Sequence, residues 1–250
     1  MIPLHVTLNH YKRKDIQEEI IYNSKNKEVA AKFDEKFGNR PDALNYPKDI
    51  LELAKQGATS FHASEELWQN PLVLSPNLKK FELDNLRVGW DLVLDIDCGF
   101  FEYSKIAADL TIKALKYHNI KSISCKFSGN KGFHIGVPFE AFPEDISNKK
   151  TEGMFPEAAR RVAFYIKELI KKPLGEKIMR FEGNDFSKIM QKTDKAETEI
   201  KYFEKNEFGD KIGLLNAEPF LNIDTILISS RHLYRMPYSL HEKSGLVSLP

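Results

Sequence analysis

The clearest pattern in the chain is the arrangement of apolar and polar positions over residues 90–139. Residues 90–97 form an apolar run that ends in two aspartates, as in a buried strand, and 103–118 carries apolar residues at helical spacing. Residues 120–127 alternate like a strand, and 133–139 follow as another strand after a glycine-containing turn, which favours a hairpin. The pattern predicts an α+β fold with a mixed or antiparallel sheet flanked by helices.

The remaining segments predict elements around this sheet. Apolar residues at helical spacing indicate one or two surface helices over 15–38, a helix over 46–55 followed by a strand over 58–62, and an amphipathic helix over 156–170. The stretch that follows has many charges and few apolar clusters, so an exposed helical or loop excursion is expected at about 171–215.

Composition narrows the class of protein. The chain has 250 residues, of which 42% are hydrophobic, and no repeat or linker marks a boundary, so a single domain over 1–250 is expected. Lys and Arg (37) nearly balance Asp and Glu (36), which excludes a strongly basic protein that coats DNA and makes any nucleic-acid contact local.

Cys98 and Cys125 lack CxxC spacing, as in a reduced, cytoplasmic protein. No apolar stretch approaches the roughly 20 residues of a membrane span, so no membrane partner is expected.

Two carboxylates at the end of the first strand are the first candidate for chemistry. Asp95 and Asp97 are two residues apart, so on a strand they share a face at a rise of about 3.3 Å per residue. Hard divalent cations prefer oxygen ligands and relieve the repulsion between two such carboxylates. The pair therefore predicts a Mg²⁺ or Mn²⁺ site, although an isolated DxD also occurs where a strand simply leaves the core.

The turn of the hairpin is the second candidate. The stretch 128–134 combines two glycines with Ser128, Lys131 and His134, which can all donate hydrogen bonds to phosphate oxygens. Taken alone, the phrase is more typical of an ordinary glycine hairpin with a solvated lysine and a half-buried histidine. It is not a Walker A loop, because GxxxxGK[ST] is absent and the turn joins two strands.

A third group lies near the end of the chain. Asp224 is expected at the start of an apolar strand over 226–228, where it would complete a cluster of three carboxylates. Arg235 and His241 follow in a segment that contains proline and glycine, which is typical of a loop or hairpin turning back over a site.

Together these phrases resemble the catalytic small subunit of archaeo-eukaryotic DNA primases, of the archaeal type. The resemblance rests on an apolar strand ending in D-x-D (94–97), on a turn similar to SGxRGxH (128–134), and on Asp224 followed by Arg235 and a P-[FY]-S-x-H-x-K-[ST]-G phrase (237–245). The order of the motifs and their approximate spacing also agree over about residues 90–250.

The resemblance implies a role for each matched residue. Lys131 stands where the family often has arginine, which keeps the charge but loses the bidentate fork. The Cys/His cluster that binds zinc in many relatives is missing, so no structural zinc is expected. The implied ligands of two Mg²⁺ or Mn²⁺ ions are Asp95, Asp97 and Asp224, which are also the catalytic residues, and the implied nucleotide-binding residues are Ser128, Lys131, His134, Arg235 and His241.

The implied activity is synthesis of short RNA primers from NTPs on a single-stranded DNA template, for DNA replication. The expected partner is a primase large subunit with an iron-sulfur domain, or an equivalent fused domain, and a complete catalytic subunit is expected to continue beyond Pro250. A primase-polymerase of repair, plasmid or defence type that extends primers with dNTPs has the same motifs. A primase-like module that binds nucleotide without catalysis, and a two-metal nuclease or phosphatase, are further alternatives.

Overall fold

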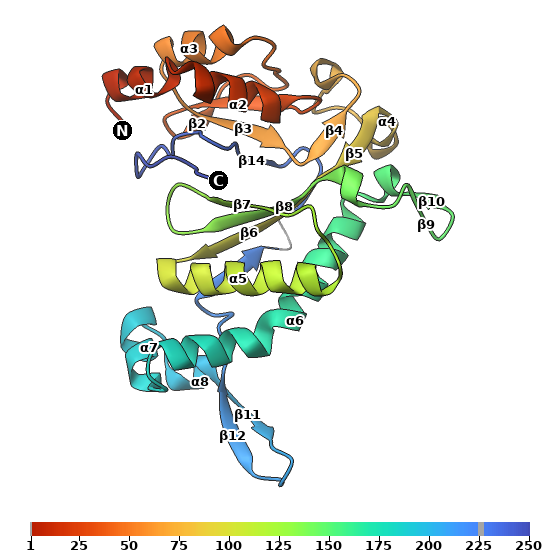
Figure 1. The fold of residues 1–250 in the computed structure, drawn as a ribbon. Coiled ribbons are helices and arrows are strands. Elements are labelled where there is room, and N and C mark those ends of the chain that lie inside the picture. Colours follow the sequence, from red (N-terminus) through yellow and green to blue (C-terminus); the bar gives the residue numbers. More distant parts are fainter. Residues whose placement is uncertain (1, 225–227) are drawn as a thin grey trace.

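Two four-stranded antiparallel sheets face each other in this protein (Figure 1). The computed structural model describes residues 2–224 and 228–250, and of Asp224 the backbone alone. The first sheet has the strand order β14-β3-β1-β2 and the second has the order β13-β6-β8-β7. Among the described residues every strand pair is antiparallel, so the predicted α+β class is confirmed in its antiparallel form.

The first sheet belongs to an N-terminal layer with helices on its outer side (Figure 1). The apolar faces of these helices pack on the sheet through buried residues such as Ile20, Ile50 and Phe61. The layer contains α1 (Leu4–Tyr11), α2 (Lys14–Ser24), β1 (Val29–Phe33), β2 (Lys36–Phe37), α3 (Pro47–Lys55), β3 (Ala58–Ser64) and β14 (Leu233–Arg235).

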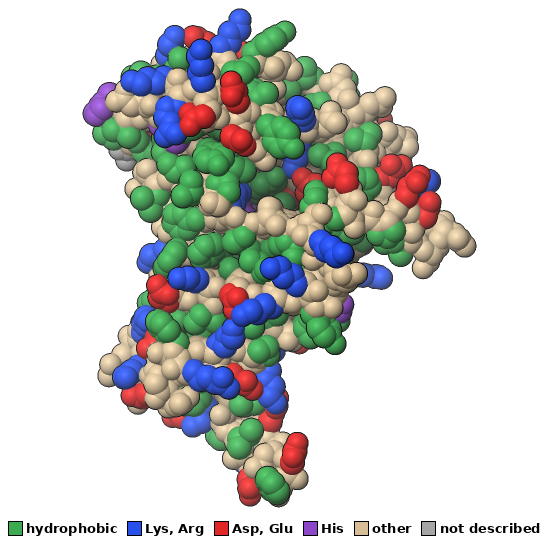
Figure 2. Space-filling model, in the orientation of Figure 1, with side chains coloured by type: hydrophobic (Ala, Val, Ile, Leu, Met, Phe, Trp, Pro, Cys, Tyr) green, Lys and Arg blue, Asp and Glu red, His purple; other side chains and the backbone are tan. Residues whose placement is uncertain are grey.

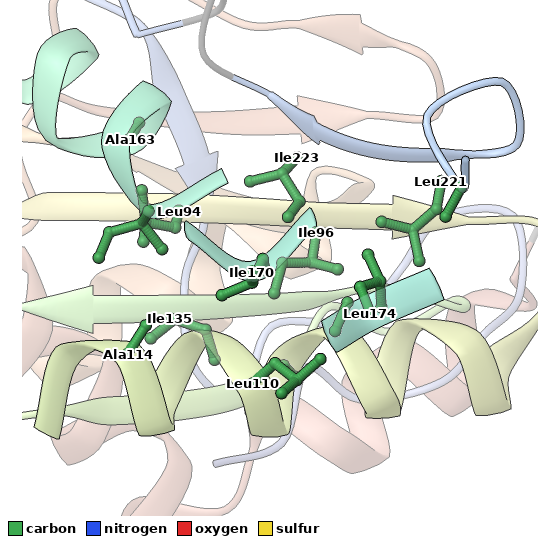
Figure 3. Close-up of a cluster of buried hydrophobic side chains, with 14 of the residues drawn as sticks. Leu94, Ile96, Leu110, Ala114, Ile135, Ala163, Ile170, Leu174, Leu221 and Ile223 are labelled. Carbon is green, nitrogen blue, oxygen red and sulfur yellow. The ribbon is translucent and has the colours of Figure 1, made fainter. Parts of the chain in front are cut away.

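The second sheet carries two long helices on the face that points away from the N-terminal layer. Figure 3 shows Leu94 and Ile96 of the central strand among side chains from α5, α6 and β13. The sheet and its helices are β6 (Leu92–Cys98), α5 (Phe101–Tyr117), β7 (Ser124–Phe127), β8 (Phe133–Val137), α6 (Glu157–Phe181) and β13 (Leu221–Asp224).

Smaller elements connect the layers and extend one end of the molecule. The hairpin of β11 and β12 projects from the lower end in Figure 1. No helix of the described residues is long and apolar enough to cross a membrane. The remaining elements are β4 (Glu66–Trp68), α4 (Lys80–Leu86), β5 (Arg87–Trp90), β9 (Asp145–Ile146), β10 (Lys149–Lys150), α7 (Phe186–Thr193), α8 (Glu197–Ile200), β11 (Lys201–Lys205), β12 (Lys211–Leu215) and the 3₁₀ turns Pro71–Val73, Phe139–Ala141 and Thr151–Met154.

The structure corrects several predicted boundaries, such as that of the strand expected over 120–127, which begins at Ser124, and two of the corrections are large. The expected surface helices over 15–38 end at Ser24, and the rest forms the β1–β2 hairpin, because β1 pairs along its length with β3, about 30 residues further on. The expected helix over 156–170 continues to Phe181 and passes through Pro173. Its buried stripe continues beyond the proline with Leu174 and Ile178, so packing on the core holds the last turns.

The assignment of alternate β6 side chains to the core can be tested by measuring the free energy of unfolding. Leu94 is fully buried among α5, α6 and β8 residues, so Leu94→Ala should lower the free energy of unfolding by about 3 kcal/mol through lost burial and a cavity. Leu72→Ala is the matched control, because Leu72 is 55% exposed and should change stability by less than about 0.5 kcal/mol. Denaturant unfolding measures both, and equal losses would contradict the assignment of Leu94 to the core.

Candidate active site

The face of β6 that is turned away from the core lines a cavity between the two sheets. Because side chains alternate on a strand, Leu92, Leu94 and Ile96 enter the core, whereas Asp95 and Asp97 face the N-terminal layer. The cavity has a volume of about 230 Å³ and is lined by His62, Glu65, Val93, Asp95, Asp97, Ser128, Asn130, His134, His232, Leu233, Tyr234, Arg235 and His241.

The strand register brings the predicted phrases together from distant parts of the chain. Asp95 pairs across the sheet with His134 of β8 on one side and with Asp224 of β13 on the other. Directly opposed residues in an antiparallel pair lie on the same face, so His134 and Asp224 flank Asp95 on one face of the sheet. The side chain of Asp224 lies outside the described part of the structure.

The expected position of Asp224 at the start of a strand is wrong. The strand β13 begins at Leu221, and Leu221 and Ile223, which precede Asp224, pack in the core. Residues 225–227, which include most of the strand expected over 226–228, lie outside the described residues. Apolar residues of the strand therefore precede Asp224, which the sequence had placed at the start of its strand.

The turn between β7 and β8 forms one wall of the cavity, as the hairpin prediction required. The Ser128 hydroxyl accepts a hydrogen bond from the Gly132 N–H (3.2 Å), which closes the turn. A Cβ atom at Gly132 would lie 2.3 Å from the Ile96 carbonyl oxygen, so glycine lets the turn pack directly on β6. Lys131 lies exposed on this turn and is not among the residues that line the cavity.

His134 connects the metal-binding candidates to a buried lysine. His134 Nε2 lies 3.5 Å from Asp95 Oδ1, and the other ring nitrogen, Nδ1, lies 2.8 Å from Lys126 Nζ. Burial, together with the positive charges of Lys126 and Arg235, holds the pKa of His134 well below its usual range. Burial and Arg235 also lower the pKa of Lys126 to about 7. His134 is therefore a neutral imidazole at neutral pH.

Arg235 is held at the cavity by its own ion pair. Its guanidinium donates to Glu242 Oε2 (2.7 Å) and to the Leu240 carbonyl oxygen (2.7 Å), and Lys32 is the second cationic partner of Glu242. Burial alone raises the pKa of Glu242, but Lys32 and Arg235 outweigh it and lower the pKa to about 2. The position of Arg235 thus depends on a carboxylate that sequence reasoning did not single out.

His241 is oriented by backbone groups. The N–H groups of Lys243 and Ser244 donate to His241 Nδ1 at 3.3 and 3.2 Å, so Nδ1 is an acceptor. Burial and the nearby Arg235 lower the pKa of His241. In the neutral ring the proton then lies on Nε2, which leaves His241 as a hydrogen-bond donor on that side.

The N-terminal layer supplies the opposite wall, which sequence reasoning missed. His62 of β3 is the cross-strand partner of Arg235, and burial with the Arg235 charge keeps its pKa well below the usual value. Glu65 is almost completely buried, its pKa is raised by burial, and its Oε1 lies 3.1 Å from His232 Nδ1. The sequence feature that could have identified this wall is the series of polar residues His62, Ser64 and Glu65 in a stretch that is buried in the structure.

A second, larger cavity of about 760 Å³ adjoins the first. The two cavities share Val93, His134 and Tyr234. Its cationic and anionic side chains are equal in number: Lys25, Lys27 and Lys126 against Glu19, Asp91 and Glu140. Asp91, on the same face of the β5–β6 segment as the other aspartates, pairs with Lys27 Nζ and accepts from the Phe139 N–H (3.0 Å), so its role is structural.

The described carboxylates suit Mg²⁺ or Mn²⁺ bound partly by water and substrate, and they do not form a complete set of protein ligands around an ion. Among the residues whose side chains the structure describes, no group of three or more His, Cys, Asp or Glu is arranged to hold a metal ion. Mg²⁺, however, commonly binds through one or two protein carboxylates and completes its shell with waters and substrate phosphates. Asp95 and Asp97 on one face of β6 fit that mode, with Asp224 adjacent in register.

Comparisons with known proteins support the fold and leave the activity open. No family model matches the chain. An uncharacterized protein of Methanocaldococcus jannaschii, MJECS07, is 44% identical over 112 residues, which cover 43% of this chain and 24% of that protein. The polymerase domain of Mycobacterium tuberculosis Ligase D, solved in complex with DNA, has a TM-score of 0.56 at 13% identity and covers 98% of this chain and 79% of its own. The chain therefore has a fold similar to that of this polymerase domain, in agreement with the predicted α+β class.

The ion pair of Glu242 predicts a pH-dependent stability. Because its pKa is about 2 in the folded state against about 4.5 unfolded, the ionised carboxylate stabilises the fold above pH 4.5 and loses this effect as the pH falls toward 2. Wild type should exceed Glu242→Gln by about 3 kcal/mol at pH 6, and the difference should shrink toward pH 2. Denaturant unfolding across this range measures it.

The matched control for this prediction is Glu52→Gln. Glu52 forms an exposed pair with Lys55 and should change stability by less than about 1 kcal/mol. A difference between wild type and Glu242→Gln that stayed constant from pH 6 to pH 2 would contradict the assigned ion pair.

Proposed function

We propose that this protein is a nucleotidyltransferase of the primase type, which makes short RNA primers from NTPs on single-stranded DNA. The observation that carries the proposal is the register of three adjacent strands. It sets Asp95 beside His134 and Asp224, and Asp97 lies on the same face two residues further along β6. Carboxylates for metal ions and donors for phosphate thus border one cavity, as transfer of a nucleotidyl group requires.

The carboxylates of Asp95, Asp97 and Asp224 would hold two Mg²⁺ or Mn²⁺ ions, which supply activation of the attacking 3′-hydroxyl and neutralise charge on the triphosphate. Through these carboxylates the ions would be held on strands β6 and β13. The buried placement of β6 limits its movement and favours a fixed geometry for in-line attack.

The proposed triphosphate ligands are hydrogen-bond donors that line the cavity around the aspartates. His134 and His241 present N–H groups, Ser128 adds a hydroxyl and Arg235 a guanidinium. Lys131, which lies on the exposed part of the same turn, would reach the outer phosphates only. Neutral imidazoles suit this role because they donate to phosphate oxygens without titrating near pH 7.

Template binding is proposed to depend on a further subunit or fused domain. Cations and anions are equal in number in the larger cavity, and Figure 2 shows Lys and Arg interspersed with Asp and Glu over the face in view. Tight sequence-independent binding of DNA needs several uncompensated cations. The proposed partner is a primase large subunit with an iron-sulfur domain, in line with the family resemblance.

A second candidate is a primase-polymerase that extends existing primers. It is favoured by the similarity in fold to a polymerase domain solved with DNA. The two candidates share the carboxylates and phosphate donors, and they differ in the need for a primer and in the sugar of the preferred nucleotide.

The proposal predicts metal-dependent primer synthesis. With single-stranded DNA, labelled NTPs and Mn²⁺ or Mg²⁺, the protein should produce short products without added primer. Asp95→Asn and Asp97→Asn should each lower the rate about 10³-fold, because several kcal/mol of charge stabilisation is lost. Gel analysis of products measures both the rate and the length.

Asp109→Asn is the matched control, because Asp109 lies half-exposed on α5, paired with Lys113 and Lys177 away from the cavity. Extension of a supplied primer alone would favour the primase-polymerase. Nucleotide binding without any product, unchanged in Asp97→Ala, would instead indicate a binding module, and strand cleavage would indicate a nuclease.

A further inference from the structure

Lys126 is a buried lysine whose position neither the motifs nor the proposed chemistry explains. It lies on β7 directly opposite His134 of β8, so both side chains are on the cavity face. Lys126 is 8% exposed, and its ammonium contacts His134 Nδ1 (2.8 Å) and Ser248 Oγ (3.0 Å). The Ser248 hydroxyl itself donates to the Phe127 carbonyl oxygen (2.9 Å), so its oxygen is an acceptor for Lys126.

These contacts decide which nitrogen of His134 carries the proton. Lys126 has N–H groups to donate whether its amine is charged or neutral, so Nδ1 can accept a hydrogen bond in both states. The opposite arrangement, with the proton on Nδ1, would turn the lone pair of Nε2 toward Asp95 Oδ1 at 3.5 Å. The buried Nε2 acceptor would then face a carboxylate oxygen, which is also an acceptor, and this costs free energy.

We infer that Lys126 is a positioning residue that holds His134 in the tautomer with the proton on Nε2. This tautomer turns an N–H donor toward the cavity where, on the proposed function, the triphosphate of the incoming nucleotide binds. Lys126 does not itself touch the substrate and acts through the imidazole.

A second histidine of the cavity also has a donor at Nδ1 that leaves the proton on Nε2, which supports the inference. His241 Nδ1 accepts from the backbone N–H groups of Lys243 and Ser244, so His241 too carries its proton on Nε2. Backbone N–H groups of a turn donate to Nδ1 of His241, and the side chain of Lys126 on the neighbouring strand donates to Nδ1 of His134. Both rings are thereby preset as donors before a ligand binds, which lowers the cost of ordering them on binding.

The tautomer can be measured directly on the ¹⁵N-histidine-labelled full chain by long-range ¹H–¹⁵N NMR, with His134 assigned from the spectrum of His134→Ala. We expect Nδ1 of His134 to give the signal of an unprotonated, hydrogen-bonded nitrogen and Nε2 that of a protonated one. In Lys126→Met the Nδ1 signal should shift to that of a nitrogen without a hydrogen bond. Lys113→Met, an exposed lysine on α5, is the matched control and should leave it unchanged.

A kinetic cycle tests whether Lys126 acts through His134. Lys126→Met and His134→Ala should each raise KM for the NTP roughly ten-fold, as expected for loss of a hydrogen bond to a charged group. Because both variants remove the same interaction, the double variant should lose no more than His134→Ala alone. Multiplied losses in the double variant would show that Lys126 has an independent role.

The two readouts separate failure of this inference from failure of the proposed function. A wild-type spectrum with the proton on Nδ1, or an Nδ1 signal that does not move in Lys126→Met, overturns the inference whether or not the protein makes primers. If Lys126→Met does not fold, a wild-type spectrum with the proton on Nδ1 still overturns the inference. The predicted tautomer in a protein without polymerase activity would keep the positioning role of Lys126 and overturn only the proposed function.

Discussion

The whole arrangement depends on the central strand β6, which is buried on one face and lines a cavity on the other. Leu92, Leu94 and Ile96 anchor the strand in the core between α5 and α6, and the intervening residues are forced toward the N-terminal layer. A shift of one residue in register would bury both aspartates and expose the core residues. Hydrophobic packing on one face therefore fixes the carboxylates on the other, without any need for contacts among the carboxylates themselves.

A second constraint joins the two sheets. The chain leaves β13 in one sheet and enters β14 in the other, and buried carboxylates hold the segment before β14. Glu66 accepts from Arg87, Ser230 and the Arg231 N–H, whereas Glu28 pairs with the guanidinium of Arg231. Breaking such a buried pair costs several kcal/mol because a charge is left unpaired. These bonds keep β14, and with it Arg235, at a fixed place on the wall facing Asp95.

Features of the fold and the site that depend on residues close in sequence could be predicted, and those that depend on contacts between distant segments could not. The strand with Asp95 and Asp97 and the 128–134 hairpin follow from local alternation and glycine placement, so the sequence predicted them correctly. β1 was misread as helix because its Ala and Lys residues favour helices and only pairing with β3 overrides that preference. His62 and Glu65 were not assigned, because their place across the cavity from Asp95 arises from packing of one sheet on the other. Glu242 was not assigned, because its partner Lys32 lies far away in the sequence. Lys126 was not assigned for a related reason, because its pairing with His134 follows only from the register of β7 and β8.

The charges around the cavity bear on how a triphosphate would bind there. Arg235 is offset by Glu242, the pKa values of His134 and His241 are lowered so that both rings are neutral, and Lys131 lies outside the cavity. Asp95 and Asp97 on the same wall repel an anion. Neutral donors can orient phosphate oxygens but cannot overcome this repulsion, so the free energy for binding a triphosphate must come largely from divalent cations held between the aspartates and the phosphates. On the proposed function, the same aspartates that would organise catalysis would thus make nucleotide binding itself dependent on metal, and the fixed imidazole donors would then select the orientation of the bound phosphates.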